Sequence, residues 1–451
     1  MSFNFLPYDQ SQMLLMPPSL EEWVGTESLA RFISDVVDEL DARGQLQGFY
    51  AKYRSDGWGR AAYPPRMMVK VLLYGCAVGV RSTRKVDQAL EHDVCFRYLA
   101  GNLRPDFRTL ASFRAEHAEA MDGLFVHVLQ LCREAGLVKL GQVALDGRRV
   151  AGNAALERSR TKAGLQAIVR KMFEEIDATD TAEDALYGKD KRGDELPEEL
   201  RTREGRLKAI RSALDQLKKP EEEIRAAYEE KVEARRRLEE KTGKPAKGRK
   251  PKLKEDQIKR LRVNLTDPDS RMMKARKGFV QGYNGQAMVD CSSQVIVAQD
   301  LRQDAVDWAL AAPMLKQCEL QAGARPKACI MDGGYWSEAN AALEDQRTKL
   351  YIAVGSSAEI EGRPDSRIRK RRLRKGAHAV KMRKRLKTET GRAIYKQRGS
   401  TVEAVFGQMY ERGLNRYLMR GLNQVRAEWS LWCTTHNLLK LWRAVIAPQP
   451  I

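Results

Sequence analysis

Two short apolar runs, each followed by an aspartate and a glycine, constrain the fold of this chain most strongly. The first run, Val143–Leu145, leads to Asp146, and the second, Cys329–Met331, leads to Asp332. Runs of this length that stop at turn residues predict buried strands, and the glycine predicts that each strand ends there. One such aspartate is usually a turn former. Two of them, after two strands of one sheet, indicate a pair of carboxylates at a shared edge.

A third carboxylate, Glu403, follows later in the chain. It lies in residues 400–407, which we interpret as the start of a helix. Two aspartates at strand ends and one helical glutamate supply the oxygen ligands that a hard divalent cation prefers. The sequence therefore predicts a metal site formed by Asp146, Asp332 and Glu403.

The segments between these acids predict a mixed α/β domain. Two apolar runs joined by a polar turn predict a β-hairpin across residues 278–298. Residue patterns predict helices at 304–320 and 337–345 and a last strand at 350–354. This order of elements is typical of a mixed sheet covered by helices, and it would place the three acids along one edge of that sheet.

Residues 1–138 predict an all-α domain resembling a helix-turn-helix reader of DNA. Apolar residues recur at helical spacing across Ser28–Leu40, and Pro64, Ser82 and Asp106 are placed to begin further short helices. Short helices joined by tight turns, with arginines among them, are typical of such readers, although helical bundles with surface arginines look the same. The candidate DNA contacts here are Arg108 and Arg114.

The segment 156–262 is rich in Glu, Lys, Arg and Ala and has few aromatic residues. Its apolar residues recur at a coiled-coil spacing that is interrupted at Lys219 and Pro220, so we predict a helical hairpin or antiparallel coiled coil broken there. The basic stretch Lys244–Lys254 is interpreted as a mobile tip. This insertion would divide the α/β domain into residues 139–155 and 263–445. We expect the insertion either to contact DNA or a second subunit, or to serve as a solvated spacer.

The charge of the chain favours a polyanionic partner. A formal net charge of +20 and an isoelectric point near 9.6 would attract nucleic acid from a distance, whereas a hydrophobic content of 43% describes a folded protein. The most basic stretch, residues 363–385, precedes Glu403 and could hold a phosphate backbone, although a charge run is usually only solvated. The candidate DNA contacts in it are Arg369, Arg371 and Arg372.

Compartment and redox state follow from two further features. No apolar run reaches the roughly 18 residues that a membrane helix needs, and the first residues lack the basic segment of a signal peptide, so we expect a cytoplasmic protein with no membrane partner. The seven cysteines are odd in number and scattered, which predicts reduced thiols.

Taken together, these residues resemble the bacterial insertion-sequence transposases of the DDE class, which have a ribonuclease-H-like catalytic domain. The resemblance covers nearly the whole chain, and it is specific because several separate segments agree. Those segments are Leu15–Trp23, Tyr63–Leu110, Asn264–Arg271, Gln281–Asn284, Asp332–Asn340 and His436–Lys440.

The family's C-terminal signature is a tyrosine, an arginine, a glutamate and a lysine. Tyr395, Arg398 and Glu403 match it, with four residues between the last two where the best-known form has three. The lysine is not matched. Tyr410 stands seven residues after Glu403, and Arg412 lies close by. The missing lysine leaves open which residue would take its role. The triad of Asp146, Asp332 and Glu403 is complete.

The resemblance implies a transposase that binds the terminal inverted repeats of its own element and target DNA, as a homodimer in the synaptic complex at the nucleoid. It would cleave and join strands with two Mg²⁺ ions, or Mn²⁺ as a substitute, about 3.5 to 4 Å apart. Tyr395 and Arg398 would grip phosphates, and Trp336 would stack on an unpaired base unless it is a core indole. The alternatives are a non-catalytic DNA-binding regulator, which predicts a damaged triad, and a metal-dependent nuclease of the same fold.

Overall fold

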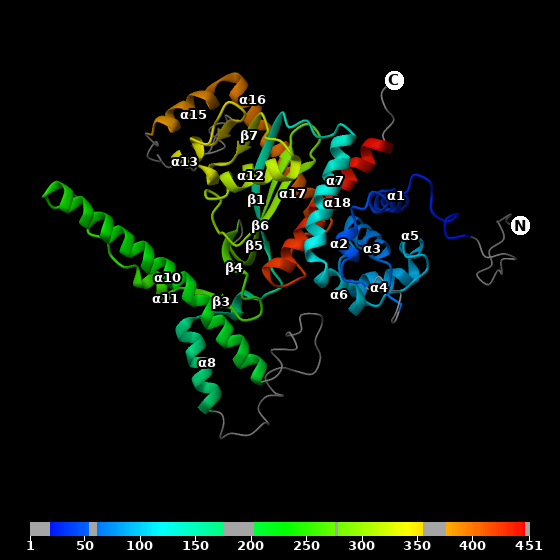
Figure 1. Ribbon diagram of the computed structural model, residues 1–451, viewed down its shortest axis with the longest axis horizontal. Coiled ribbons are helices and arrows are strands. Elements are labelled where there is room, and N and C mark those ends of the chain that lie inside the picture. Colours follow the sequence, from blue (N-terminus) through cyan, green and yellow to red (C-terminus); the bar gives the residue numbers. More distant parts are fainter. Residues whose placement is uncertain are drawn as a thin grey trace, which may run out of the picture.

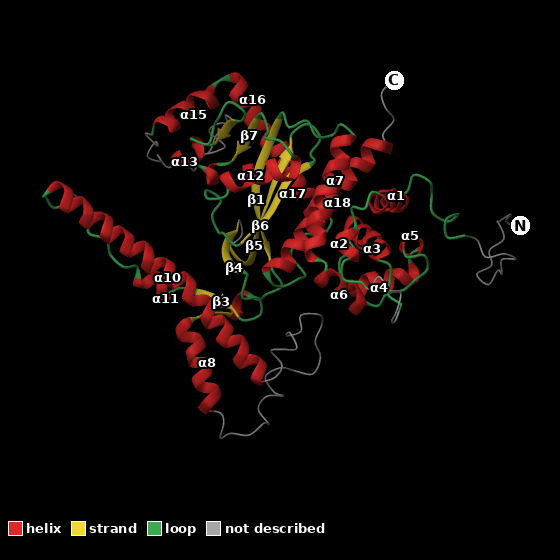
Figure 2. Ribbon diagram, viewed as in Figure 1, coloured by secondary structure: helices red, strands yellow, loops and turns green. Residues whose placement is uncertain are grey.

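A computed structural model describes residues 19–53, 61–174, 203–246, 248–275, 278–354 and 376–446. A mixed sheet lies at its centre, with the N-terminal helices on one side and a long helical insertion projecting on the other (Figures 1 and 2). The predicted contacts Arg369, Arg371 and Arg372 lie outside the described residues.

The central sheet has six strands in the described part of the chain: β1 (Gln142–Ala151), β4 (Arg271–Ala275), β5 (Gly278–Asp290), β6 (Ile296–Arg302), β7 (Ala328–Met331) and β8 (Lys349–Ile352). Strand β5 pairs antiparallel with β1 along one edge, and with β4 and then β6 along the other. Beyond β1, the strands β7 and β8 follow in parallel. The prediction of a mixed sheet is confirmed, and β5 with β6 forms the predicted hairpin.

Strand register makes the two aspartates neighbours. Met331 of β7 lies opposite Leu145 of β1 in the parallel pairing, and Asp332 and Asp146 are the residues that follow them. Strand β7 stops there, as predicted, whereas β1 continues beyond Gly147. The predicted turn at Gly147 is therefore wrong. The long strand β5 supplies backbone partners along the whole of β1, so the chain has no reason to turn where its apolar run stops.

Seven helices precede the sheet in the described residues: α1 (Leu29–Ala42), α2 (Gln47–Tyr50), α3 (Pro65–Ala77), α4 (Thr83–His92), α5 (Val94–Leu99), α6 (Phe107–Glu116) and α7 (Ala118–Glu134). Several begin where the sequence predicted. The Ser28 hydroxyl accepts the backbone N–H of Arg31, and the Asp106 carboxylate accepts that of Thr109. Pro65 opens α3, where its missing N–H is not needed.

These helices and the sheet share one hydrophobic core. Helix α7 packs along α18 (Leu422–Ile446), which also covers β6 (Figure 1). Arg81, between α3 and α4, reaches into the same region. Its guanidinium donates to the Glu428 carboxylate on α18 at 3.1 Å and lies 5.1 Å from the Trp432 ring centroid. The helical N-terminal region is therefore held rigidly against the α/β part.

The insertion leaves the sheet after β1 and has a small core of its own. Its described elements are the 3₁₀ turn η1 (Leu156–Arg158), β2 (Ser159–Thr161), α8 (Lys162–Glu174), α10 (Arg203–Thr242), α11 (Glu255–Lys259) and β3 (Arg262–Asn264). The predicted break at Pro220 is wrong, because α10 runs through it as one helix. An internal proline removes one backbone hydrogen bond, and the many remaining turns of this long helix hold its course.

The helical elements described between β6 and α18 are α12 (Ala311–Ala322), the 3₁₀ turn η5 (Gly333–Tyr335), α13 (Glu338–Ala341), α15 (Ala377–Lys387), α16 (Glu389–Arg398), the π turn η6 (Gly399–Glu403) and α17 (Ala404–Glu411). Two of them, α12 and α13, are shorter than the helices predicted at residues 304–320 and 337–345. Residues 304–310, predicted as helix, form a loop before α12. Among the described residues, none of the helices combines the length and apolar composition that crossing a bilayer requires.

Candidate active site

Asp146 and Asp332 lie side by side at the edge where β7 ends. The backbone N–H of Gly147 donates to Asp146 Oδ1 at 2.8 Å, and the backbone N–H of Gly334 donates to Asp332 Oδ1 at 2.8 Å. Each of these bonds holds one carboxylate oxygen of its aspartate in place. The adjacent strands, not the loops, therefore set the separation of the two acids.

Glu403 lies in the π turn η6, inside the helical run from α16 to α17. Such a turn inserts one extra residue and changes the face on which the following side chains lie. The sequence predicted a helix start here, and the structure places the glutamate in the middle of a run that begins at Glu389. Its side chain is 54% exposed and is the most open member of the triad.

Arg398 joins the acids that come from opposite parts of the chain. Its Nη1 lies 2.7 Å from Asp146 Oδ2, and its Nη2 donates to Glu403 Oε1. The arginine side chain is 11% exposed and that of Asp146 is 18% exposed, so this contact is mostly buried. One guanidinium therefore holds together an acid of β1 and an acid 257 residues later in sequence, which is the difference between positions 146 and 403.

Burial is the main influence on the charge state of Asp146. Burial raises the pKa of Asp146 to about 7, Arg398 opposes this, and the neighbouring carboxylates of Asp332 and Asp307 raise it further. A cation bound beside Asp146 would stabilise its ionised carboxylate and lower its pKa.

Asp307, in the loop before α12, is a fourth acid at this edge, and sequence reasoning missed it. Its Oδ1 accepts from Asn284 Nδ2 at 2.8 Å and Gln286 Nε2 at 3.2 Å, and its Oδ2 accepts from Arg149 at 2.8 Å. Two polar side chains at alternate positions of an otherwise apolar strand were the available signal, because they must find a partner when buried.

Comparison with known proteins finds two family models that match separate segments of the chain. Residues 18–116 match a family model described as a transposase domain (DUF772), and residues 363–442 match one described as a transposase DDE domain. No curated protein and no solved structure matches the chain. The second match contains Arg398 and Glu403.

These two matches support a transposase of the DDE class.

In this transposase, two residues expected to touch DNA lie inside the protein. Tyr395 has no exposed surface and Trp336 is 8% exposed, so the indole packs in the core. Arg398, the second member of the signature, contacts Asp146 and Glu403. The prediction that Trp336 stacks on a base stays untested, and its burial favours the alternative that we gave for it.

The position of the missing signature lysine is occupied by an exposed tyrosine with a cation over it. Tyr410 of α17 is 53% exposed, and the Arg148 guanidinium lies 5.1 Å from its ring centroid. Arg148 follows Asp146 by two residues in β1, so both side chains lie on the same face of the strand. The transposase therefore has a positive charge beside its acids that comes from β1.

The N-terminal helices of the transposase present a second basic surface. The guanidinium groups of Arg84 and Arg108 lie 5.2 and 5.7 Å from the Phe107 ring centroid, and both arginines are exposed. Arg114, predicted to contact DNA, is only 9% exposed and donates to the backbone oxygen of Arg81. We therefore do not place Arg114 on the DNA-facing surface.

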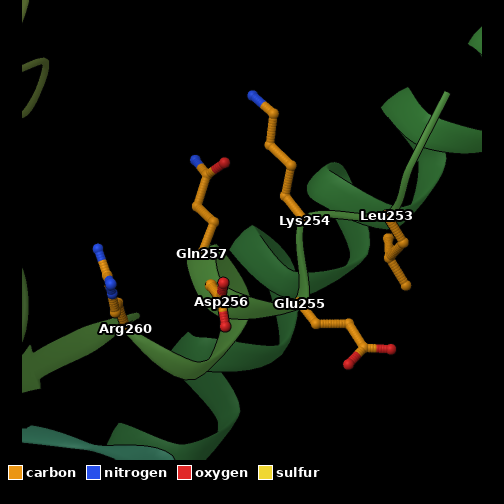
Figure 3. Close-up of a pocket in the computed structure, with 6 residues that line it drawn as sticks. All are labelled: Leu253, Lys254, Glu255, Asp256, Gln257 and Arg260. Carbon is orange, nitrogen blue, oxygen red and sulfur yellow. The ribbon is translucent and has the colours of Figure 1, made fainter. Parts of the chain in front are cut away.

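One hollow in the surface of the described residues lies away from the three acids. Figure 3 shows it on the insertion, around α11, where it contains none of the acids discussed above. It is lined by Leu253, Lys254, Glu255, Asp256, Gln257 and Arg260.

Within the described residues, no three His, Cys, Asp or Glu side chains are spaced as a ready metal cage. The guanidinium of Arg398 provides the positive charge between Asp146 and Glu403 instead. The donors are nevertheless hard carboxylate oxygens, and Asp146 has carboxylate neighbours that raise its pKa. The donor chemistry fits a divalent cation better than it fits a soft metal.

Proposed function

We propose that this transposase binds the terminal inverted repeats of its own insertion sequence and cleaves and joins DNA strands there, with Asp146, Asp332 and Glu403 as its catalytic acids. One observation carries the proposal. Three acids from three distant segments converge at one sheet edge, two through strand register and the third through Arg398.

The strand order supports a ribonuclease-H-like core. The order β6-β5-β1-β7-β8, with only β5 antiparallel to its neighbours, places the first acid on the central strand β1 and the second after the adjacent strand β7. An arrangement of this kind exposes both carboxylates at one end of the sheet.

Asp146, Asp332 and Glu403 would hold the divalent metal, which we propose to be Mg²⁺ with Mn²⁺ as a substitute. Bound metal of this kind activates an attacking hydroxyl and stabilises the leaving oxygen of a phosphodiester. The backbone N–H groups of Gly147 and Gly334 orient the two aspartates for this task.

The remaining residues of the site would hold the DNA. Arg148, braced on Tyr410, can donate to a phosphate beside the acids, because among the described residues no acid pairs with it. Arg84 and Arg108 would contact the terminal repeat from the N-terminal helices, and the double-stranded DNA would run between the two basic surfaces. Joining two ends requires two copies of the chain, so we propose a homodimer that acts on the bacterial nucleoid in the cytoplasm.

The test compares cleavage with binding. A plasmid that carries the element's ends is incubated with Mg²⁺ and the parent protein, Asp146→Asn, Asp332→Asn or Glu403→Gln, and end binding is measured on the same proteins. Each variant should lose several orders of magnitude in cleavage rate and keep its affinity, because the amide keeps the shape of the carboxylate and loses its charge.

Asp345→Asn is the matched control, since this acid caps a turn between α13 and β8 and pairs with Arg325 away from the triad. It should cleave like the parent. Variants of the triad that cut as well as the parent, or a parent that cuts equally well with chelator, would refute the proposed chemistry. Cutting without preference for the ends would favour a nuclease, and end binding without cutting a regulator.

A further inference from the structure

Three basic side chains gather without an acidic partner where α17 meets α18. Arg412 follows the end of α17, and Lys440 and Arg443 lie near the end of α18. Repulsion among these cations contributes to lowered pKa values. Burial, then Arg443 and Arg412, lower the pKa of Lys440 to about 8, and burial followed by Arg443 lowers that of Arg412.

The same three charges lower the pKa of the buried histidine His436. Burial lowers its pKa to about 3, a hydrogen bond to the backbone oxygen of Gln294 opposes this, and Arg412, Lys440 and Arg443 lower it further. No acid within the described residues forms an ion pair with any of the three cations. Buried cations are normally paired, since an unpaired one loses its hydration without compensation.

Two side-chain nitrogens of Arg412 also lack hydrogen-bond partners. Its Nε and Nη2 atoms are buried, and neither has a partner in the described part of the chain. Lys440 Nζ donates to the neutral side chain of Gln294 at 2.6 Å, and Arg443 is exposed. The group is therefore closed at Arg412, half-buried at Lys440 and open to solvent at Arg443, which is the form of a site that an anion can enter from outside.

The group lies next to the catalytic turn. Gln294, in the turn between β5 and β6, accepts from Lys440 and donates from Nε2 to the backbone oxygen of Ser400 at 2.8 Å. Ser400 belongs to the π turn η6 that ends at Glu403. One side chain thus connects the cations to the segment that positions the third acid.

The group also lies at the seam with the N-terminal helices. The backbone oxygen of Arg412 would be 3.1 Å from a Cβ placed on Gly79, and Arg81 donates to the backbone oxygen of Gly413. Helix α4, which carries Arg84, begins at Thr83. The group thus lies between the helix that carries Arg84 and the turn that carries Glu403.

We infer that Arg412, Lys440 and Arg443 form a binding site for a phosphate of the DNA backbone. The phosphate supplies the negative charge that no acid of the described residues provides at this place. The site rests on the proposed DNA substrate, and it reads no base sequence because its donors meet only the backbone. Its position ties backbone binding at the seam to the turn that carries Glu403.

The first test measures affinity against salt concentration without divalent metal, so its result does not depend on cleavage. Duplexes with and without the element's end are titrated with the parent, Arg443→Gln and Lys440→Gln. Both variants should bind both duplexes about tenfold more weakly, and the slope of log affinity against log salt should flatten by about 0.9 for each lost phosphate contact. An unchanged slope would overturn the inference.

Arg325→Gln is the control, because Glu319 and Asp345 already neutralise this arginine. Its slope should equal that of the parent. If it flattens the slope as much as Arg443→Gln does, the effect reflects net charge and the site is refuted.

The second test uses the free protein. Removing a charge from a repulsive group should leave the melting temperature of Arg443→Gln unchanged or raise it, whereas a structural role for Arg443 predicts a decrease. Inorganic phosphate should raise the melting temperature of the parent more than that of the variant. A phosphate effect without any change in the DNA slope would mean that the site takes only a free ion, and the assignment to DNA would be wrong.

Discussion

Arg398 contacts both Asp146 and Glu403, and its contact with Asp146 should contribute much more to the free energy of unfolding than its contact with Glu403. The Asp146 contact joins side chains that are 18% and 11% exposed, whereas Glu403 is 54% exposed. Breaking a buried pair by removing one partner lowers the free energy of unfolding by about 3 to 5 kcal/mol, and an exposed pair contributes at most about 1 kcal/mol. Arg398→Met should therefore destabilise the protein by about 3 to 4 kcal/mol, nearly all of it through Asp146.

The measurement is a pair of double-mutant cycles. Urea unfolding is followed in chelator, at a pH above the value of about 7 to which burial raises the pKa of Asp146. Arg398→Met is combined with Asp146→Asn in one cycle and with Glu403→Gln in the other. We expect a coupling free energy of about 2 to 3 kcal/mol in the first cycle and below about 1 kcal/mol in the second.

Equal coupling in the two cycles, or a larger value with Glu403, would refute the reasoning. It would mean that Arg398 is a clamp on the helical glutamate and that the buried contact with β1 adds no stability. Wild-type behaviour of Arg398→Met in chelator would lead to the same conclusion.

Two further predictions concern the frame of the site. Gly147→Ala should lower the melting temperature strongly, because the added Cβ would lie 2.0 Å from Gln286 Nε2, whereas Gly141→Ala, with nothing within 4 Å, should melt like the parent. Glu344 pairs with Arg385, which lowers the pKa of the Glu344 carboxyl to about 2, so this contribution to stability is complete above the unfolded pKa near 4.5 and is lost as the pH falls towards 2. In acid melts Glu344→Gln should lack this part of the pH dependence, and a variant that loses stability in acid as steeply as the parent would contradict the assignment.

The sequence by itself determined the features that depend on near neighbours in the chain. The apolar run before Asp332 forms a strand, and the polar and glycine residues from Asp332 onward end it. Ser28, Pro65 and Asp106 begin their helices through contacts within one turn. The two aspartates could be paired from sequence because each follows a short apolar run, and the two runs pair as parallel neighbouring strands.

Only the tertiary structure decided which side chains meet across long separations. The extension of β1 past Gly147 depends on a partner strand more than a hundred residues away, and the contact of Arg398 with Asp146 depends on how the C-terminal helices lie on the sheet. Asp307 entered the site in the same way, held by polar residues of β5. The inward direction of Arg114 was also invisible, because an arginine in a short amphipathic helix has the same local pattern whether it faces solvent or a neighbouring backbone oxygen. Local patterns report what a residue can do, whereas burial and partner are properties of the packed whole.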